Sequence, residues 1–177
     1  YEKGVDLTNQ KDFKGAEAKF LEAWAIQKSY DVAANLGVVE MELGKPAEAA
    51  IYLTYALSNF PASGPTTKRE WIEARLTEVR RKVAIVTLNI NVPGAEVRVN
   101  GKVLGTAPLE GEQFLPPGPC RIEVTAAGYE PDVQSVTLPA GTTHKMRISL
   151  RPPPKSVVPA FVVGGAGVAA VAAGLAL

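Results

Sequence analysis

Residues 79–92 have the sequence VRRKVAIVTLNINV, and the fold class is decided in this stretch. Before about residue 84, apolar residues recur with the period of an amphipathic helix. From Val86 to Val92 every second residue is aliphatic, which is typical of a half-buried strand. We therefore predict a multidomain α + β chain. Its segments are a helical domain over residues 1–83, a small antiparallel β-sandwich over 84–151, a proline-rich juncture at 152–155 and a single transmembrane helix over 156–177.

The composition excludes several functional classes. The chain has 177 residues, of which 19 are basic and 18 acidic, with a formal net charge of +1, whereas nucleic-acid-binding domains are usually strongly basic. One cysteine, Cys120, and one histidine, His144, are too few for an intrachain disulfide or a cysteine-based zinc site. The sequence contains no nucleophile triad, phosphate-binding loop or dinucleotide fingerprint. We expect no enzyme, no catalytic or metal-binding residue, no cofactor and no nucleic-acid partner.

Turn signals divide the helical part. We expect a break at Lys14-Gly15, a helix that opens with Asp31 as its N-cap, and a turn at Gly44–Pro46 that ends this helix and starts the next. A loop at Phe60–Pro65 precedes a last helix from about Thr66 to Val83. The apolar stripe of the last helix consists of Trp71, Ile72, Leu76 and Val79. Such a stripe lets a helix cover the end of a repeat stack.

The helical part also contains an internal period. Gly4 and Gly37 are 33 residues apart. The same spacing relates Ala16 to Ala49, Phe20 to Leu53, and Ala23 to Ala56. Small residues let paired helices approach closely, and the large residue between them fills the groove. This pattern resembles the tetratricopeptide (TPR) repeat, a helix–turn–helix of about 34 residues, although Glu40 replaces the aromatic residue usual in its first helix.

The TPR resemblance implies two repeats with a capping helix, which bind a protein or peptide on their concave face. By repeat position, this face would carry Val5, Thr8, Asn9, Asp31, Val38, Met41 and Glu42. The alternative is that these residues only cover a solvated surface.

The β-rich part alternates short strands with turns. Asn100-Gly101 is a strong signal for a two-residue hairpin, and Pro93-Gly94, Leu115–Pro119 and Pro139–Thr142 mark further turns. The spacing predicts six short strands, which is typical of a small antiparallel sandwich or a partly open barrel.

The same part resembles a PEGA domain from Ala84 to Arg151. The motifs that carry the resemblance are Pro93–Val97, Val99–Gly101, Gly105–Pro108, Leu115–Gly118, Val124 and Ala127–Tyr129. The resemblance implies a non-catalytic β module of a kind found on bacterial and archaeal envelope proteins. TPR-like helices, a PEGA-like domain and a membrane segment, in this order, resemble envelope proteins of bacteria such as myxobacteria.

Three single side chains of the β-rich part have more than one interpretation. Tyr129, in a Gly-Tyr-Glu-Pro turn, is a candidate to stack on a glycan, and the alternative is that it plugs one end of the sandwich. Cys120 is interpreted as a small apolar residue rather than a reactive thiol. His144 is interpreted as an exposed residue at a strand end, with no second histidine to share a metal ion.

The C-terminal run from Ser156 to Leu177 contains 22 residues and no charge. At 1.5 Å per residue, a helix of this length reaches roughly 30 Å, the thickness of the hydrocarbon layer. Small residues at four-residue spacing are candidates for association with a second membrane helix. They are Ala160, Gly164, Ala166, Ala170 and Gly174. The alternatives are a buried helix and a tail rich in alanine and glycine.

Together these features predict a single-pass membrane protein with residues 1–155 on the periplasmic side. The first hypothesis is a non-catalytic envelope scaffold, in which the helices bind a protein partner and the PEGA-like domain is a spacer or contacts the envelope. The second is a module that binds cell-wall glycan or peptidoglycan. The third is the extracytoplasmic subunit of a signalling protein with its output domain after residue 177. The predicted partners are therefore a protein or peptide, the lipid bilayer, cell-wall glycan and a second copy bound through the membrane helix.

Overall fold

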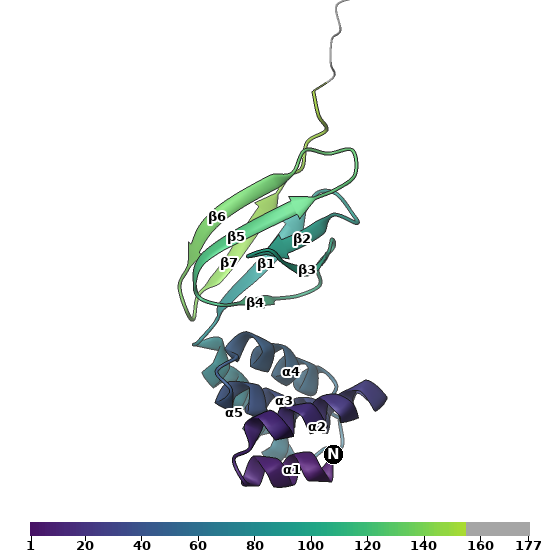
Figure 1. Cartoon of the computed structure of the whole chain (residues 1–177), viewed down its shortest axis with the longest axis vertical. Coiled ribbons are helices and arrows are strands. Elements are labelled where there is room, and N and C mark those ends of the chain that lie inside the picture. Colours follow the sequence, from purple (N-terminus) through teal and green to yellow (C-terminus); the bar gives the residue numbers. More distant parts are fainter. Residues whose placement is uncertain (155–177) are drawn as a thin grey trace, which may run out of the picture.

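The computed structural model describes residues 1–154, which form five helices followed by seven strands (Figure 1). The helices are α1 (Glu2–Asn9), α2 (Phe13–Ile26), α3 (Tyr30–Glu42), α4 (Pro46–Ser58) and α5 (Thr66–Arg80). The strands are β1 (Ala84–Ile90), β2 (Glu96–Val99), β3 (Lys102–Thr106), β4 (Gln113–Leu115), β5 (Gly118–Thr125), β6 (Asp132–Leu138) and β7 (Thr143–Ile148). We refer to residues 1–82 as the helical unit and to residues 83–154 as the β unit.

The predicted membrane segment, residues 156–177, lies outside the described residues, and so do its candidate association residues Ala160, Gly164, Ala166, Ala170 and Gly174. Within residues 1–154, none of the helices combines the length and the apolar character needed to cross a bilayer.

The first four helices form two pairs, α1–α2 and α3–α4, with the same close contact in each pair. A Cβ atom built on Gly4 would lie 2.8 Å from the ring of Phe20, and one built on Gly37 would lie 2.5 Å from Cγ of Leu53. Neither position has room for a larger residue, because interiors are close-packed. Both the glycines and their large partners are 33 residues apart, so the predicted period exists as a recurring packing contact.

The start of α2 differs from the prediction of a break at Lys14-Gly15. Gly15 lies in the first turn of α2, where its N–H donates to Oδ1 of the N-cap Asp12 at 3.0 Å. The turn comes earlier, because Lys11 has a φ of 61° and ends the helical path after α1. A short polar residue that caps a helix therefore decided this boundary, and the glycine did not.

The start of α3 also differs from the prediction. Ser29, not Asp31, is the N-cap, and its Oγ accepts a hydrogen bond from the N–H of Val32 at 3.3 Å. Asp31 lies in the first turn of the helix and pairs with Lys68 of α5. The carboxylate is therefore used to join two helices rather than to cap one. The predicted turn at Gly44–Pro46 is confirmed, with Pro46 in the first turn of α4.

The β unit is a sandwich of two sheets with strand orders β4-β1-β7 and β3-β2-β5-β6. The predicted hairpin is confirmed: Asn100 and Gly101, with φ of 50° and 81°, join β2 to β3. The prediction of an entirely antiparallel sandwich is wrong, because β1 and β7 pair in parallel, from Ile85 opposite Thr143 to Ile90 opposite Ile148. The other strand pairs of the described residues are antiparallel.

The prediction of six strands missed β4. This strand has only three residues, which is too short for a period of two to be recognised. Its central residue, Phe114, belongs to the buried cluster of the helical unit and not to the core of the sandwich.

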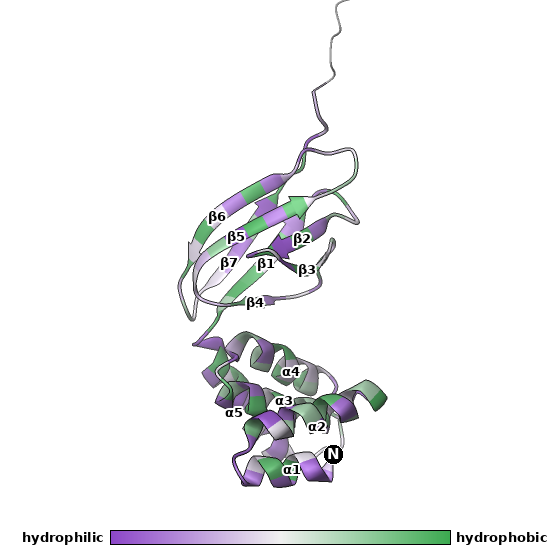
Figure 2. Ribbon diagram, in the orientation of Figure 1, coloured by the Kyte–Doolittle hydropathy of each residue, from purple (hydrophilic) through white to green (hydrophobic). Residues whose placement is uncertain are grey.

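The core of the sandwich is aliphatic. Its buried side chains come from valine, leucine, isoleucine and alanine, together with Cys120. Bands of hydrophobic and hydrophilic residues alternate along β5 and β6 (Figure 2), as expected for strands that bury one face and expose the other.

The two units share a core at their junction. Val83, Ile85 and Phe114 of the β unit are buried in one cluster with Leu53, Ile72 and other residues of α3, α4 and α5. Arg80, at the end of α5, pairs with Glu112 beside β4 and lies over the ring of Phe114, 5.8 Å from its centroid. The N–H of Gly141, in the turn between β6 and β7, donates to the carbonyl of Val83 at 2.7 Å. The junction is therefore packed and hydrogen-bonded, and α5 runs almost directly into β1.

Candidate functional site

The predicted binding-face residues lie on two helices. Val5, Thr8 and Asn9 are on α1, and Asp31, Val38, Met41 and Glu42 are on α3. The two helices are joined where Nδ2 of Asn35 donates to the hydroxyl of Tyr1 at 2.9 Å. This hydrogen bond therefore joins the residue that precedes α1 to the middle of α3.

Four of the seven predicted residues have internal roles. Val5 and Met41 pack against the buried clusters of the helical unit. The hydroxyl of Thr8 donates to the carbonyl of Gly4 at 2.9 Å, and Asp31 is paired with Lys68. The side chains that remain for contact with a partner are Asn9, Val38 and Glu42, which are exposed or half-buried.

Two residues of α5 that were not predicted as site residues continue the 33-residue spacing of this face. Trp71 and Arg75 lie 33 residues after Val38 and Glu42. Trp71 was predicted to belong to the apolar stripe, but its side chain is 40% exposed, with the guanidinium of Arg75 5.7 Å from its ring centroid. Extending the 33-residue period by one step would have identified both residues. We call Asn9, Val38, Glu42, Trp71 and Arg75 the helix face.

The buried charge of the helical unit lies behind this face. Glu40 of α3 is only 3% exposed, and its Oε2 lies 3.3 Å from Nζ of Lys45, which also bonds Oε1 of Glu17 at 2.5 Å. Burial raises the pKa of the Glu40 carboxyl, and the nearby Glu17 raises it further, while Lys45 opposes the rise. Glu40 occupies the position where the TPR pattern has an aromatic ring. Its carboxylate belongs to a charged cluster with Lys45 and Glu17.

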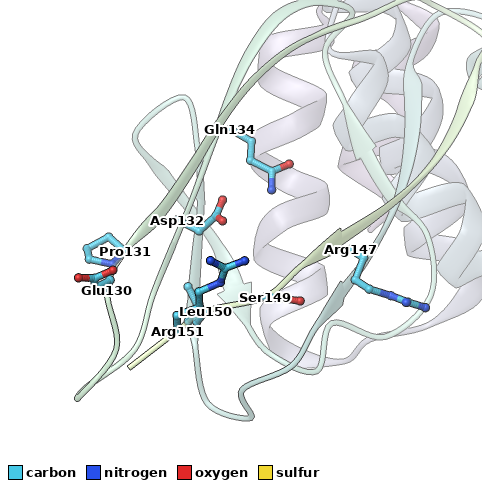
Figure 3. Close-up of a pocket in the computed structure, with 8 residues that line it drawn as sticks. All are labelled: Glu130, Pro131, Asp132, Gln134, Arg147, Ser149, Leu150 and Arg151. Atoms are coloured by element: carbon cyan, nitrogen blue, oxygen red, sulfur yellow. The ribbon is translucent and has the colours of Figure 1, made fainter. Parts of the chain in front are cut away.

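A polar pocket opens between the outer strands of the two sheets, β6 and β7 (Figure 3). Its volume is about 440 Å³. Asp132 and Gln134 from β6 and Arg147 from β7 line it, together with residues at the ends of these strands. The other lining residues are Glu130, Pro131, Ser149, Leu150 and Arg151. We call this hollow the β6–β7 pocket. Sequence reasoning did not predict it, because strand pairing had to be known before β6 and β7 could be placed as neighbours.

The three single side chains of the β unit have distinct environments. Tyr129 lies in the turn after Gly128, next to the β6–β7 pocket in sequence, and is 38% exposed. Cys120 is buried in the aliphatic core, and burial raises the pKa of its thiol. His144 lies within β7, half-buried, with its Nε2 2.7 Å from the hydroxyl of Thr142. The described part of the chain contains no cluster of histidine, cysteine or carboxylate side chains that could hold a metal ion.

Comparison with known proteins agrees with this description of the β unit. The search of curated proteins found no match to the chain. Residues 83–154, which comprise all seven strands and the shared junction residue Val83, match the PEGA domain family. The chain thus consists of a helical region followed by a segment similar to the PEGA domain.

Proposed function

We propose that this chain is a non-catalytic, membrane-anchored scaffold of the bacterial envelope. The TPR-like helices bind a protein partner, the PEGA-like domain holds them at a distance, and residues 156–177 anchor the chain in the membrane. The observation that carries this proposal is the shared core at the junction, where Phe114 and Ile85 are buried among helical residues. A module packed in this way presents its helices at a fixed orientation, which is what a spacer has to do.

The arrangement of the two ends supports the same proposal. The helices lie at one end of the β unit, and the chain leaves residue 154 at the opposite end (Figure 1). An anchor that follows residue 154 would therefore hold the helical unit away from the membrane, with the length of the sandwich between them.

The helix face supports the binding part of the proposal. Trp71 and Arg75 form an exposed aromatic–cation pair, and tryptophan and arginine are among the residues most enriched at the energetic centres of protein interfaces. Val38 lies at the equivalent position on the neighbouring helix and is absent from the buried clusters of the unit. We expect a polypeptide partner to contact α3 and α5 together.

Photo-crosslinking tests the binding of a partner. A photoreactive amino acid at Trp71 or Glu42 of the full chain, expressed in cells, is expected to yield a discrete crosslinked protein. The matched control has the same amino acid at Glu48, an exposed residue of α4. Crosslinks of equal yield and identity at all three positions would contradict a specific helix face.

Protease protection tests the location. The loop after α4, from Asn59 to Pro65, is mostly exposed and should be cleaved. Cleavage in intact spheroplasts is expected if the helical unit lies outside the inner membrane. Protection until lysis would place it in the cytoplasm and would contradict an envelope scaffold.

A glycan-binding function is the second candidate, and the exposed ring of Tyr129 is the observation that favours it. Binding of the full chain to purified cell wall, lost in Tyr129→Ala and kept in Tyr55→Phe, would support this function. Equal binding of the two variants would contradict it.

A further inference from the structure

The hydrogen bonds of β5 show which backbone groups β6 presents at its outer edge. The N–H of Arg121 donates to Oδ1 of Asn100, and the carbonyl of Arg121 accepts from the N–H of Asn100, both at 2.8 Å. Both backbone groups of Arg121 therefore point toward β2 and β3. In an antiparallel pair, hydrogen-bonded residue pairs alternate with pairs that are not hydrogen-bonded. Arg121 lies opposite Ser135, so the N–H and C=O of Ser135 face away from β5.

The same alternation extends along β6. Val133 and Thr137, two positions to either side of Ser135, also direct their backbone groups away from β5. Thr137 lies opposite Pro119, which has no N–H to donate. Within residues 1–154, no further strand lies beyond β6 in its sheet. We call the outward N–H and C=O groups of Val133, Ser135 and Thr137 the β6 edge. Such a row of groups is a template for pairing with another strand.

The other outer strands of the sandwich have features that oppose this kind of pairing. Strand β4 has only three residues, and β3 is interrupted by a register shift against β2. In β7, the carbonyl of Thr142 accepts from the N–H of Ile85 in β1, so the outward positions that follow include Lys145 and Arg147. Short strands, bulges and charged side chains all protect an edge. The β6 edge has seven residues, a continuous register and only valine, serine and threonine at its outward positions.

A strand added to β6 would have room for its side chains. Successive side chains of a strand point to opposite faces, so every second residue of the added strand would point to the same face as Gln134, which lines the β6–β7 pocket. The volume of this pocket is about 440 Å³. The remaining side chains would lie on the solvent face, beside those of Val133, Ser135 and Thr137, which are exposed. An added strand would therefore cover a hollow that the sandwich leaves open on this side.

The residues that border this position favour acidic side chains in the added strand. From Val133 to Leu138, β6 has no charged residue. From Thr143 to Ile148, β7 has two exposed cations, Lys145 and Arg147, and no acidic residue. The acidic residues of the pocket lie at the start of β6 and before it. Because opposite charges attract near a protein surface, glutamate in the middle of the added strand is favoured over lysine.

The orientation of β6 indicates that the added strand belongs to a different protein. Strand β6 begins near the end of the β unit where Glu130 bonds Arg151, and it ends near the helical unit, where Gly141 bonds Val83 (Figure 1). Two identical edges that pair about a two-fold axis run antiparallel. Two copies joined in this way would point their helical units in opposite directions, which does not fit two chains anchored upright in one membrane.

We propose that the β6 edge binds an extended segment of another protein as an added antiparallel strand. The segment alternates small or β-branched residues with acidic residues, and its acidic side chains point toward the β6–β7 pocket. Its backbone bonds Val133, Ser135 and Thr137. This surface is separate from the helix face and gives the scaffold a second attachment point. The choice of another protein over a second copy rests on the proposed membrane anchor.

The test of strand pairing uses the full chain in a non-ionic detergent and a capped heptapeptide, STEVETS, as the probe. Amide hydrogen exchange, followed by NMR, is expected to be fast at Val133, Ser135 and Thr137 in the chain alone. With the peptide at saturation it should be at least about tenfold slower. N-methylation of the central valine of the peptide, whose N–H would point to Ser135, should weaken binding about tenfold, since one backbone hydrogen bond is lost. N-methylation of the preceding glutamate, whose N–H would point away from β6, is the matched control. Equal effects of the two methylations would overturn the proposal.

A second peptide tests the chemistry of the segment. The peptide STKVKTS, with lysine in place of both glutamates, should bind at least about tenfold more weakly to the unchanged chain. The double variant Lys145→Glu, Arg147→Glu should reverse this preference. The control Lys102→Glu, which changes an exposed cation of β3, should keep it. Equal binding of the two peptides to the unchanged chain would refute an acidic segment.

Exchange without peptide tests the alternative occupant. Protection of the β6 edge that rises with the concentration of the chain alone would show pairing with a second copy and would overturn the proposal. Partition of the full chain into vesicles is measured in parallel. Peptide binding without partition would refute the anchor and support the β6 edge, whereas partition without peptide binding would refute the β6 edge alone.

Discussion

The helical unit and the β unit build their cores from different side chains. The four ring–ring contacts of the described residues all lie in the helical unit, and they involve Tyr1, Phe20, Trp24, Tyr30, Tyr52, Tyr55 and Phe60. The sandwich core is aliphatic, and the two aromatic residues of the β unit, Phe114 and Tyr129, lie outside it. Helices that approach through glycine and alanine leave gaps that large rings fill, whereas two sheets interdigitate alternating branched side chains.

Unfolding of each unit can be followed by a different side chain. Both tryptophans, Trp24 and Trp71, lie in the helical unit, and the single cysteine, Cys120, is buried in the sandwich. Tryptophan fluorescence therefore reports unfolding of the helices, and the reactivity of the Cys120 thiol reports opening of the sandwich. Following both probes in the same variants shows whether the two units unfold together.

The largest effect is expected from Phe20→Ala. Phe20 is fully buried and fills the contact with Gly4, and loss of a buried phenylalanine ring costs about 3–5 kcal/mol. The free energy of unfolding measured by tryptophan fluorescence in urea should fall by this amount. A smaller fall for the exposed Leu21→Ala would serve as the control, and equal effects at the two positions would contradict the packing described for α2.

Phe114→Ala is expected to cost slightly less, about 3 kcal/mol, because its ring retains 6% exposure. Its effect differs in kind, since Phe114 belongs to the β unit but is buried among helical residues. The tryptophan and Cys120 transitions, which we expect to coincide in the unchanged chain, should separate in this variant. Coincident transitions in Phe114→Ala would show that the junction does not couple the two units.

Gly37→Ala is expected to destabilise the helical unit by about 1–3 kcal/mol, because an added methyl group overpacks the contact with Leu53. Urea unfolding followed by tryptophan fluorescence measures the loss. A second variant, Gly37→Ala with Leu53→Val, should recover part of it by making room for the methyl group. If the double variant were less stable than the sum of the single changes predicts, the recurring glycine contact would not explain the close approach of α3 and α4.

The smallest effect is expected from Glu40→Gln, and it depends on pH. The pKa of Glu40 is raised in the folded chain, so between its unfolded and folded pKa values the folded state binds more protons, and stability falls as pH rises. The glutamine of the variant cannot titrate, so the stability of the variant relative to the unchanged chain should increase as pH rises from about 4.5, the ordinary carboxyl pKa, toward neutrality. Urea unfolding at several pH values measures this. The exposed Glu48→Gln is the control, and a difference that does not vary with pH would contradict a raised pKa.

Local signals in the sequence predicted those parts of the fold that depend on neighbouring residues. The Asn100-Gly101 hairpin and the Gly44–Pro46 turn follow from backbone preferences of two or three residues, and both are present. The glycine contacts follow from the 33-residue period. The N-cap of α3 was assigned to Asp31 because serine and aspartate have similar capping preferences, and only the position of Lys68 explains why Asp31 is used elsewhere.

The features that were missed depend on contacts between distant parts of the chain. The parallel pairing of β1 with β7 joins residues almost 60 positions apart, and no local pattern distinguishes it from an antiparallel pair. Phe114 lies in a strand too short to be recognised from the sequence, and its ring is buried with the residues of the other unit. The β6–β7 pocket exists only because these strands are the outer members of different sheets. In each case the structural role of a residue depends on which distant segment packs against it, and this segment cannot be identified from the neighbouring sequence.

The parallel pair of β1 and β7 has a mechanical consequence. Tension between the helical unit and the chain after residue 154 pulls β1 from its first residue and β7 from its last, which lie at opposite ends of the pair (Figure 1). The load therefore acts along the strands and shears the hydrogen bonds from Ile85–Thr143 to Ile90–Ile148 together, instead of opening them one after another. Because forced unfolding is governed by the unfolding rate, a pair that has to break all at once resists extension far longer than one that unzips. A sandwich loaded between these two points therefore keeps its length until the whole pair shears.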